Sequence, residues 1–330
     1  MSEHVLIILG MHRSGTTLTA EWLQQCGLHI GERLSYPWSS RPEGLYEDKD
    51  FVELHKKILR RNRVTHLLKR PIQLQTDEED RKQALALIEA RRGFPNWGWK
   101  DPRTAFLLPF WHELLPSAQY LIVYRHYTQV VDSLHRRNRF QSLAVSAHYV
   151  RDERFDGDGW FSRRTMVRLY RHMVRHYPRQ ASWIRHYLMN PLRQFRSSFF
   201  NLPLTKLYTQ NWAYYNQAIL DFYHGDPERC LCLSIGQILT HSELLIEHLN
   251  QSWGFTLSPV PAKSVFDPRK LKQDKKGWQT RLCEWLVPSI PQIYAELKAA
   301  EAETLWKLHG SQQWEQSAIS DMFDWALDKS

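Results

Sequence analysis

The chain has 330 residues, enough for one large domain with a full hydrophobic core. Its 42% hydrophobic and 24% charged residues are ordinary for a globular protein, and its four scattered cysteines suggest neither a disulfide framework nor a zinc site. No stretch reaches transmembrane length, so we expect a soluble protein of a reducing compartment, the cytoplasm. The net charge of +9 suits an anionic ligand, although nucleic acid or a membrane surface would suit it equally.

The first seventeen residues predict a strand, a glycine loop and a helix. Residues 5–9 form an unbroken apolar run, which is typical of a strand buried on both faces. A loop from Gly10 to Gly15 follows, and from Thr16 the apolar residues recur at helical spacing. The loop N–H groups and the helix N-terminus would converge on one point, where both favour an anion. A phosphate-binding loop is therefore predicted, with a plain glycine turn as the alternative.

This loop has the spacing of the G-x-x-x-x-G-K-[ST] phosphate loop but lacks its lysine. Thr16 and Thr17 occupy the Lys-[ST] positions, and the cation of the loop is Arg13. Nucleoside triphosphatases also hold Mg²⁺ with an aspartate that follows another strand. No such aspartate ends the apolar runs 120–124 and 230–235. The pattern favours a phosphate-like group bound without a metal ion.

A loop is expected at residues 31–44, which carry two prolines and several serines, and the apolar spacing from Phe51 predicts a helix. Glu47 lies at the mouth of this helix. It is either a functional carboxylate beside the loop or an acid that stabilises the helix dipole. Residues 77–92 predict an exposed amphipathic helix.

Aromatic and charged side chains are packed together at residues 94–103, which end in Lys100-Asp101-Pro102-Arg103. We expect no plain strand here, because Pro102 would end a hydrogen-bonded ladder. The charges are expected to face a cleft. An internal cluster of ion pairs among Lys100, Asp101 and Arg103 is the alternative.

Another short apolar run at residues 120–124 predicts a strand that ends in Arg125, and a helix follows from about Thr128. Ligands of open parallel sheets bind beyond the carboxyl ends of the strands. Arg125 should therefore lie at the same edge as the glycine loop, and Ser133 is placed to share an anion with it. A surface ion pair is the alternative role for Arg125.

Together these motifs resemble the sulfotransferase family that uses 3′-phosphoadenosine-5′-phosphosulfate (PAPS), in its bacterial branch. The likeness is carried by residues 10–17, 97–103 and 120–133, and more weakly by residues 212–216 with the strand from Cys230. It covers about residues 1–140 and 205–255. The resemblance implies an α/β fold, a three-layer parallel sheet of the P-loop nucleoside triphosphate hydrolase type, forming one domain over residues 1–330.

The resemblance also implies a role for individual residues. Arg125 and Ser133 would bind the 3′-phosphate. Glu47 is the expected base that takes a proton from an acceptor hydroxyl, with His12, Asp101 and His55 as alternatives. Lys100 and Arg103 would hold charge near the transferring group or orient the base. Arg13 is expected to be catalytic together with Glu47 and Lys100, and no metal ion is expected. The residues expected to cradle the phosphosulfate are His12, Arg13, Ser14, Gly15, Thr16 and Thr17.

The chain departs from the family pattern at several places. Leu18 stands where many relatives have a tryptophan that stacks on adenine, and Tyr127 stands where a proline is common. Lys275 and Lys276 faintly resemble a basic segment that closes over the 3′-phosphate. Residues 141–205 form an extra Arg-rich stretch, expected to be a helical insertion that serves as a lid or acceptor platform, or a hairpin packed on the core.

The sequence leaves the acceptor open: a carbohydrate, a lipid or another small molecule, with large or anionic acceptors included. Nucleic acid is not expected as a partner. A helix is expected over residues 237–253, and apolar residues near the C-terminus, among them Trp285, Ile293, Leu297 and Trp306, are expected to form core or the face of a homodimer. Two other classes are kept as alternatives. One is a nucleotide kinase-like enzyme with a degenerate loop, and the other is an anionic-polymer-binding protein with an inactive nucleotide site.

Overall fold

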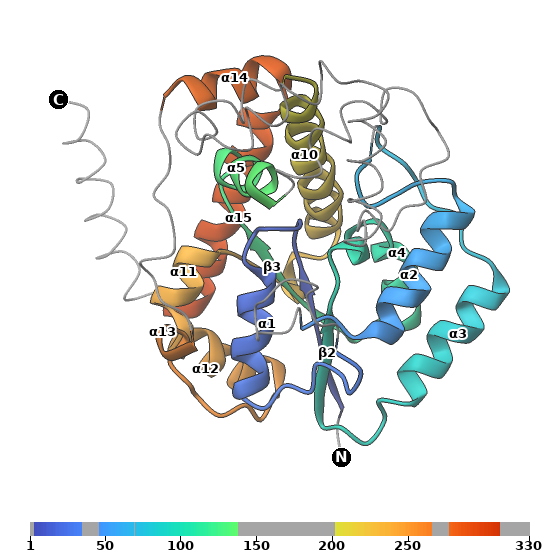
Figure 1. The fold of residues 1–330 in the computed structure, drawn as a ribbon. Coiled ribbons are helices and arrows are strands. Elements are labelled where there is room, and N and C mark those ends of the chain that lie inside the picture. Colours follow the sequence, from blue (N-terminus) through green and yellow to red (C-terminus); the bar gives the residue numbers. More distant parts are fainter. Residues whose placement is uncertain (1–2, 35–45, 69, 138–201, 266–276, 311–330) are drawn as a thin grey trace, which may run out of the picture.

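The computed structural model of the chain describes residues 3–34, 46–68, 70–137, 202–265 and 277–310. These residues form a four-stranded parallel sheet in the order β2-β1-β3-β4 (Figure 1). The carboxyl ends of the two central strands, β1 and β3, therefore meet at one edge, as the sequence predicts. The strands are β1 (His4–Leu9), β2 (Asn96–Lys100), β3 (Gln119–Tyr124) and β4 (Cys230–Ser234).

Helices cover both faces of the sheet, because the strands point alternate side chains into two apolar clusters. One cluster is covered by α2 (Lys49–Arg61), α3 (Glu78–Glu89), α4 (Leu108–Leu114), α5 (Tyr127–Arg137), α10 (Leu202–Gly225) and α14 (Trp278–Leu286). The other is covered by α1 (Thr16–Gln25), α11 (Ile235–Thr240), α12 (Ser242–Trp253) and α13 (Ala262–Val265). Helix α15 (Ile290–His309) packs beside β4 and contributes to both clusters. The expected three-layer α/β architecture is confirmed.

The expectation of no plain strand at residues 94–103 is wrong, because residues 96–100 form β2 in parallel register with β1. Trp97 and Trp99 are fully buried on one face of the sheet, and Trp99 stacks on Phe51 with 4.3 Å between ring centroids. A Cβ atom on Gly98 would lie 1.8 Å from the Leu6 carbonyl oxygen, so this glycine lets the two backbones approach. The segment forms a strand despite its mixed aromatic and charged composition, because burial of the two tryptophan rings stabilises it.

The C-terminal part differs from the expectation at a second place. The single helix expected over residues 237–253 is two helices, because His241 between α11 and α12 has a non-helical backbone. Of the apolar residues expected in a core or a dimer face, Ile293 and Leu297 are buried. Trp285 is 72% exposed and Trp306 is 49% exposed, so these two rings do not belong to the core.

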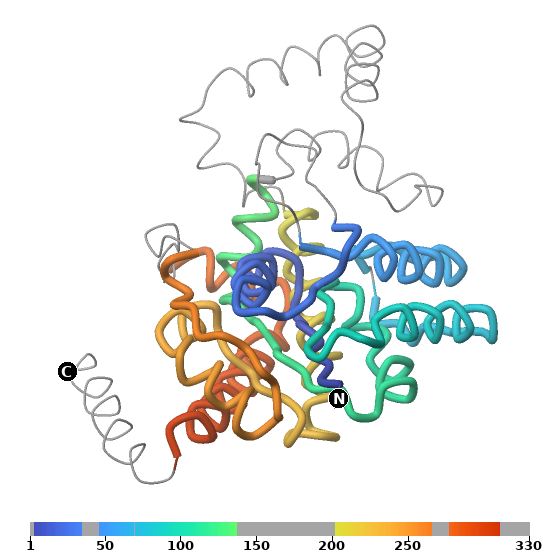
Figure 2. The backbone as a smooth tube through the Cα atoms, turned by 90° about the horizontal axis from the view of Figure 1, so that it is seen from below, coloured from blue at the N-terminus to red at the C-terminus, as the bar shows by residue number. Residues whose placement is uncertain are grey.

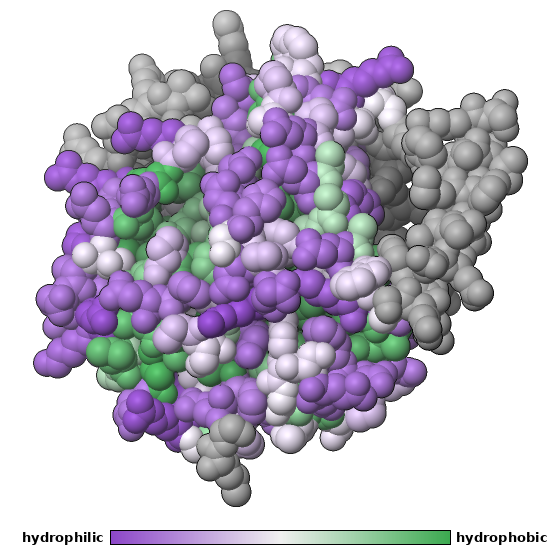
Figure 3. Space-filling view, turned by 180° about the vertical axis from the view of Figure 1, so that it is seen from behind, coloured by the Kyte–Doolittle hydropathy of each residue, from purple (hydrophilic) through white to green (hydrophobic). Residues whose placement is uncertain are grey.

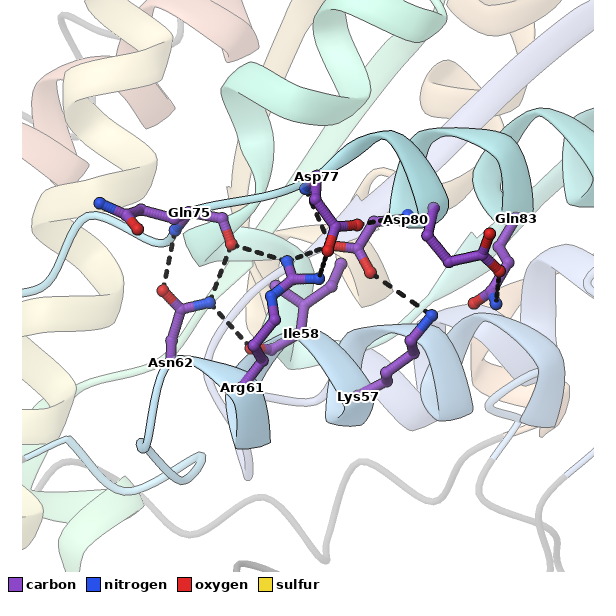
Figure 4. Close-up of polar contacts among 9 residues, drawn as sticks. Lys57, Ile58, Arg61, Asn62, Gln75, Asp77, Asp80 and Gln83 are labelled. Carbon is purple, nitrogen blue, oxygen red and sulfur yellow. Dashed lines mark hydrogen bonds and ion pairs between the residues drawn. The ribbon is translucent and has the colours of Figure 1, made fainter.

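Helices α2 and α3 lie side by side (Figures 1 and 2). They are joined around the buried carboxylate of Asp80, which accepts a hydrogen bond from Arg61 and forms an ion pair with Lys57 at 3.7 Å (Figure 4). Asp77 caps α3 and closes a capping box with Asp80. This clamp fixes α2, the helix that begins directly after Glu47 and Asp48.

The surface of the described residues, seen from behind in Figure 3, is mainly hydrophilic with small hydrophobic patches between. None of the helices in the described ranges is long and apolar enough to cross a bilayer. All four cysteines are free and buried, with Cys230 and Cys232 on one face of β4. The insertion expected at 141–205 lies outside the described residues except for its last four, which belong to α10, and Lys275 and Lys276 also lie outside.

Candidate active site

The phosphate loop, residues 10–17, makes a tight turn between β1 and α1. Gly10 has a φ of 149°, and a Cβ atom there would lie 2.2 Å from the Val123 carbonyl oxygen of β3. Gly15 has a φ of 105°, and a Cβ atom there would lie 2.7 Å from the Ile235 side chain. Only glycine fits either position without displacing its neighbours. The predicted strand, loop and helix are therefore confirmed at this place.

The loop offers donors to an anion. Helix α1 starts at Thr16 with no side chain capping its first turn and with no acidic residue in that turn. The Ser14 hydroxyl is buried and has no hydrogen-bond partner among the described residues. A buried donor and an uncapped helix N-terminus are both stabilised by a bound phosphate group. The residues of the loop therefore fit a phosphate group.

The β3 flank of the loop consists of Arg13, Arg125 and Ser133. The Nε atom of Arg13 donates a hydrogen bond to Ser133 Oγ at 2.9 Å, from the loop to the second turn of α5. Arg125 follows β3 directly, and its Nε donates to the side-chain oxygen of Gln129. The Arg125 carbonyl oxygen accepts from the indole of Trp212 at 3.0 Å. Arg13 and Ser133 are thus joined directly, a contact that the sequence analysis missed.

The β2 flank lies on the other side of the loop and begins with Glu47 and Lys100. The Nζ atom of Lys100 lies 2.7 Å from Glu47 Oε1 and 3.4 Å from Thr17 Oγ1. The Lys100 side chain is 1% exposed and that of Glu47 is 13% exposed. Burial lowers the pKa of Lys100 below its ordinary value, and the carboxylate of Glu47 opposes this shift. The structure thus joins a predicted base, a predicted cation and the phosphate loop.

Glu47 does not cap α2, because the capping residue is Asp48, which accepts from the Asp50 backbone N–H at 3.0 Å. Asp48 is buried and pairs with Arg91. Asp48 thus supplies the cap of α2, and the carboxylate of Glu47 pairs with Lys100.

The β2 flank continues in a buried chain of hydrogen bonds. Asp101 accepts from Arg103 Nη1 at 2.7 Å and from the Arg103 backbone N–H at 3.0 Å. The other carboxylate oxygen of Asp101 lies 2.7 Å from His55 Nδ1. The indole of Trp111 donates to His55 Nε2 at 2.8 Å, so the ring proton of His55 is on Nδ1 and donates to Asp101.

These hydrogen bonds bear on the expected roles of Asp101, His55 and Lys100. Burial alone would raise the pKa of Asp101, but Arg103 and His55 hold it well below its usual range. Asp101 and His55 are almost completely buried, which argues against both as the base for an acceptor hydroxyl. The internal ion pair is confirmed for Asp101 and Arg103, whereas Lys100 pairs with Glu47. Nothing in the sequence pattern identified Trp111 as the partner of His55.

His12, the remaining alternative for the base, turns toward α10. Its ring lies edge-on to those of His66 and Tyr215, with centroid distances of 5.1 and 5.8 Å. The Tyr215 hydroxyl donates to the His66 carbonyl oxygen at 2.8 Å. The loop residue His12 is therefore on the side of the loop where the aromatic residues of α10 gather.

In the part of the chain that the structure describes, no group of three or more His, Cys, Asp or Glu side chains is arranged to hold a metal ion. A family model described as "Sulfotransferase family" matches residues 6–189, more than half of the chain. No curated protein and no solved structure matches the chain. The match includes the phosphate loop, β2, β3 and α5, and it continues into residues 141–189, where we expected the resemblance to be interrupted.

Proposed function

The chain belongs to the sulfotransferase family, and on this premise we propose that it moves a sulfuryl group from PAPS to a hydroxyl of an acceptor. The observation that carries the proposal is the position of the Glu47–Lys100 pair. It lies within hydrogen-bond reach of Thr17, in the first turn after a loop built to hold an anion. A carboxylate and a buried cation beside a phosphate cradle suit transfer of a group from a phosphate to a hydroxyl.

Binding of the donor is assigned to the loop and the β3 flank. When bound, PAPS supplies an activated sulfuryl group attached to its 5′-phosphate. The loop N–H groups with Ser14, Thr16 and Thr17 hold the phosphosulfate end. Arg125 and Ser133 bind the 3′-phosphate, with Arg13 beside Ser133 adding positive charge. Because a 3′-phosphate distinguishes PAPS from other adenosine nucleotides, this flank sets the choice of donor.

The β2 flank is assigned to the transfer. Glu47 accepts the proton of the acceptor hydroxyl while the new oxygen–sulfur bond forms and the sulfur–oxygen bond to the 5′-phosphate breaks. Lys100 orients Glu47 and stabilises the negative charge that the leaving phosphate gains, since its ammonium also reaches Thr17 of the loop. The products are a sulfate ester, adenosine 3′,5′-bisphosphate and a proton held by Glu47. In the proposed reaction, protein groups stabilise the negative charge of the leaving phosphate, and no metal ion takes part.

The acceptor is proposed to be a hydroxyl of a carbohydrate, a lipid or another small molecule. The high net charge of +9 favours one that carries negative charge.

The donor assignment is tested by calorimetric titration of adenosine 3′,5′-bisphosphate and of 5′-AMP without Mg²⁺. The wild type should bind the bisphosphate about 100-fold more tightly, because charge-assisted hydrogen bonds to the 3′-phosphate contribute about 1.5–3 kcal/mol. Arg125→Ala should lose this preference and keep its affinity for AMP. The control Arg92→Ala removes an exposed arginine, 64% exposed, and should change neither affinity. A wild type without preference for the bisphosphate would contradict the proposal and favour a kinase-like enzyme.

A further inference from the structure

Arg103 has hydrogen-bonding capacity that the fold does not use. It follows β2 in a short 3-10 helix (Pro102–Phe106), and its side chain is 10% exposed. Nη1 donates to Asp101, whereas Nε and Nη2 donate no hydrogen bond to any described residue. Neither of these two nitrogen atoms is a fully buried polar atom without a partner. Both therefore retain some accessible surface. A nearly buried guanidinium is therefore fixed at one end and open at the other.

The fixed end is held rigidly. Asp101 receives three hydrogen bonds, two from Arg103 and one from His55, and His55 is in turn fixed by Trp111. Burial alone would lower the pKa of Arg103, but the carboxylates of Asp101 and Glu47 raise it, so the guanidinium remains charged. The chain from Trp111 to Asp101 thus orients a permanent positive charge at no cost of reorganisation when a ligand arrives.

The open end lies in the region where transfer is proposed to occur. Arg103 follows closely after Lys100, whose ammonium contacts Glu47, and its short helix reaches α10 through Phe106, whose ring lies 4.3 Å from that of Tyr215. Tyr215 also contacts the ring of His12 in the phosphate loop. Arg103 therefore shares its surroundings with the proposed base on one side and with a loop residue on the other. It is on the β2 flank, away from the Arg13–Ser133 contact.

We propose that Arg103 binds the sulfuryl group of the donor through its open guanidinium edge, with His55 and Asp101 as positioning residues that aim it. This inference rests on the proposed function. The planar fork of an arginine can donate two parallel hydrogen bonds to two oxygen atoms of one anionic group. A lysine ammonium matches this geometry less well. Lys100 then serves Glu47 and Thr17, and Arg103 serves the sulfuryl oxygens.

The test compares two ligands that differ only by the sulfuryl group, PAPS and adenosine 3′,5′-bisphosphate, titrated in the absence of any acceptor. In Arg103→Gln the affinity for PAPS should fall at least tenfold relative to the wild type, while that for the bisphosphate stays within about twofold. Arg103→Lys keeps a charge next to Asp101 and should give a smaller but measurable loss for PAPS. Arg81→Gln, which removes a partly exposed arginine on α3, is the control that should change neither affinity.

Bisphosphate binding also reports whether each variant is folded. If Arg103→Gln does not fold, Arg103→Lys carries the test alone. An unchanged ratio of the two affinities in a variant that binds the bisphosphate would overturn the role of Arg103 and leave the proposed function intact. A wild type that does not prefer the bisphosphate over AMP would instead contradict the proposed function itself.

Discussion

The two flanks of the phosphate loop hold their positive charges in different ways. On the β3 flank, the hydrogen bonds that the described residues show for Arg13 and Arg125 run to neutral groups, a serine hydroxyl and a glutamine amide. On the β2 flank, Lys100 and Arg103 are nearly buried and each donates to a carboxylate. A phosphate replaces a neutral partner readily, because hydrogen bonds between charged groups are the stronger ones. Charges already held by carboxylates are better suited to positioning groups for a reaction.

This comparison suggests a division of labour, with donor selection on the β3 flank and transfer on the β2 flank. Variants of one flank should then change binding of adenosine 3′,5′-bisphosphate, and variants of the other should change turnover.

The largest effect is expected from Glu47→Gln, which keeps the shape of the side chain but removes the base. Turnover, followed as release of the bisphosphate from PAPS with a hydroxyl acceptor, should fall by about 10³-fold. Affinity for the bisphosphate should stay within about twofold. Glu53→Gln, on the exposed side of α2, is the matched control and should leave both unchanged. Equal losses of turnover and of bisphosphate affinity would contradict the division between the flanks.

The support of Glu47 is tested by Asp48→Ala, which removes the cap of α2 and the buried partner of Arg91. We expect the free energy of unfolding, measured with urea, to fall by about 3 kcal/mol, because α2 loses its cap and the nearly buried Arg91 loses its buried partner and keeps only the more exposed Asp50. Asp50→Ala removes a more exposed partner of the same arginine, 3.2 Å away, and should cost less than about 1 kcal/mol. A larger cost for Asp50→Ala than for Asp48→Ala would show that the support of Glu47 is wrongly assigned.

On the β3 flank, α5 carries Ser133 and also the buried His135. Burial lowers the pKa of His135 to about 4 from 6.5, although Asp132 opposes the shift. The unfolded chain therefore binds more protons between these values, and stability is lost as the pH falls from about 6.5 to about 4. The loss attributable to this residue is at most about 3 kcal/mol.

The measurement is a series of urea unfolding experiments between pH 7.5 and pH 4.5, on the wild type and on His135→Gln. The variant should lose stability less steeply with falling pH, since glutamine does not titrate. Other buried histidines affect both proteins equally, so only the difference in slope is informative. Parallel pH profiles would refute the prediction.

The smallest effect is expected from Ser133→Ala, which removes one hydroxyl from the β3 flank. Affinity for the bisphosphate should fall about tenfold, equivalent to one charge-assisted hydrogen bond of about 1.4 kcal/mol, and affinity for AMP should not change. Ser264→Ala, at an exposed position of the short helix α13, is the control and should change neither. A loss of AMP affinity as well would place Ser133 at the 5′-phosphate rather than at the 3′-phosphate.

The sequence predicted the fold and the loop well, because both depend on local patterns. Apolar runs identified β1, β3 and β4, and paired glycines identified the turn before α1. The segment around β2 was misjudged because its two tryptophans alternate with asparagine, glycine and lysine along a strand that is buried on both sides, so it has no unbroken apolar run. Only the packing of Trp97 and Trp99 against Phe51 resolves that pattern.

The sequence predicted which residues belong to the site, but it did not predict which of them are in contact. Glu47 and Lys100 are 53 residues apart, and His55 and Trp111 are 56 residues apart. No periodicity links such positions, since their contacts arise when α2 and α4 pack on the same face of the sheet. For the same reason, the contact of Arg13 with Ser133 across 120 residues was not anticipated, although both residues were named.

The most direct test is a crystal structure of the chain with adenosine 3′,5′-bisphosphate. We predict the 5′-phosphate in the loop between Gly10 and Gly15 and the 3′-phosphate within hydrogen-bond distance of Arg125 and Ser133. Glu47 and Lys100 should remain paired, and Glu47 should contact neither phosphate. A 3′-phosphate bound by Lys100 or Arg103 on the β2 flank would contradict the division of labour between the two flanks.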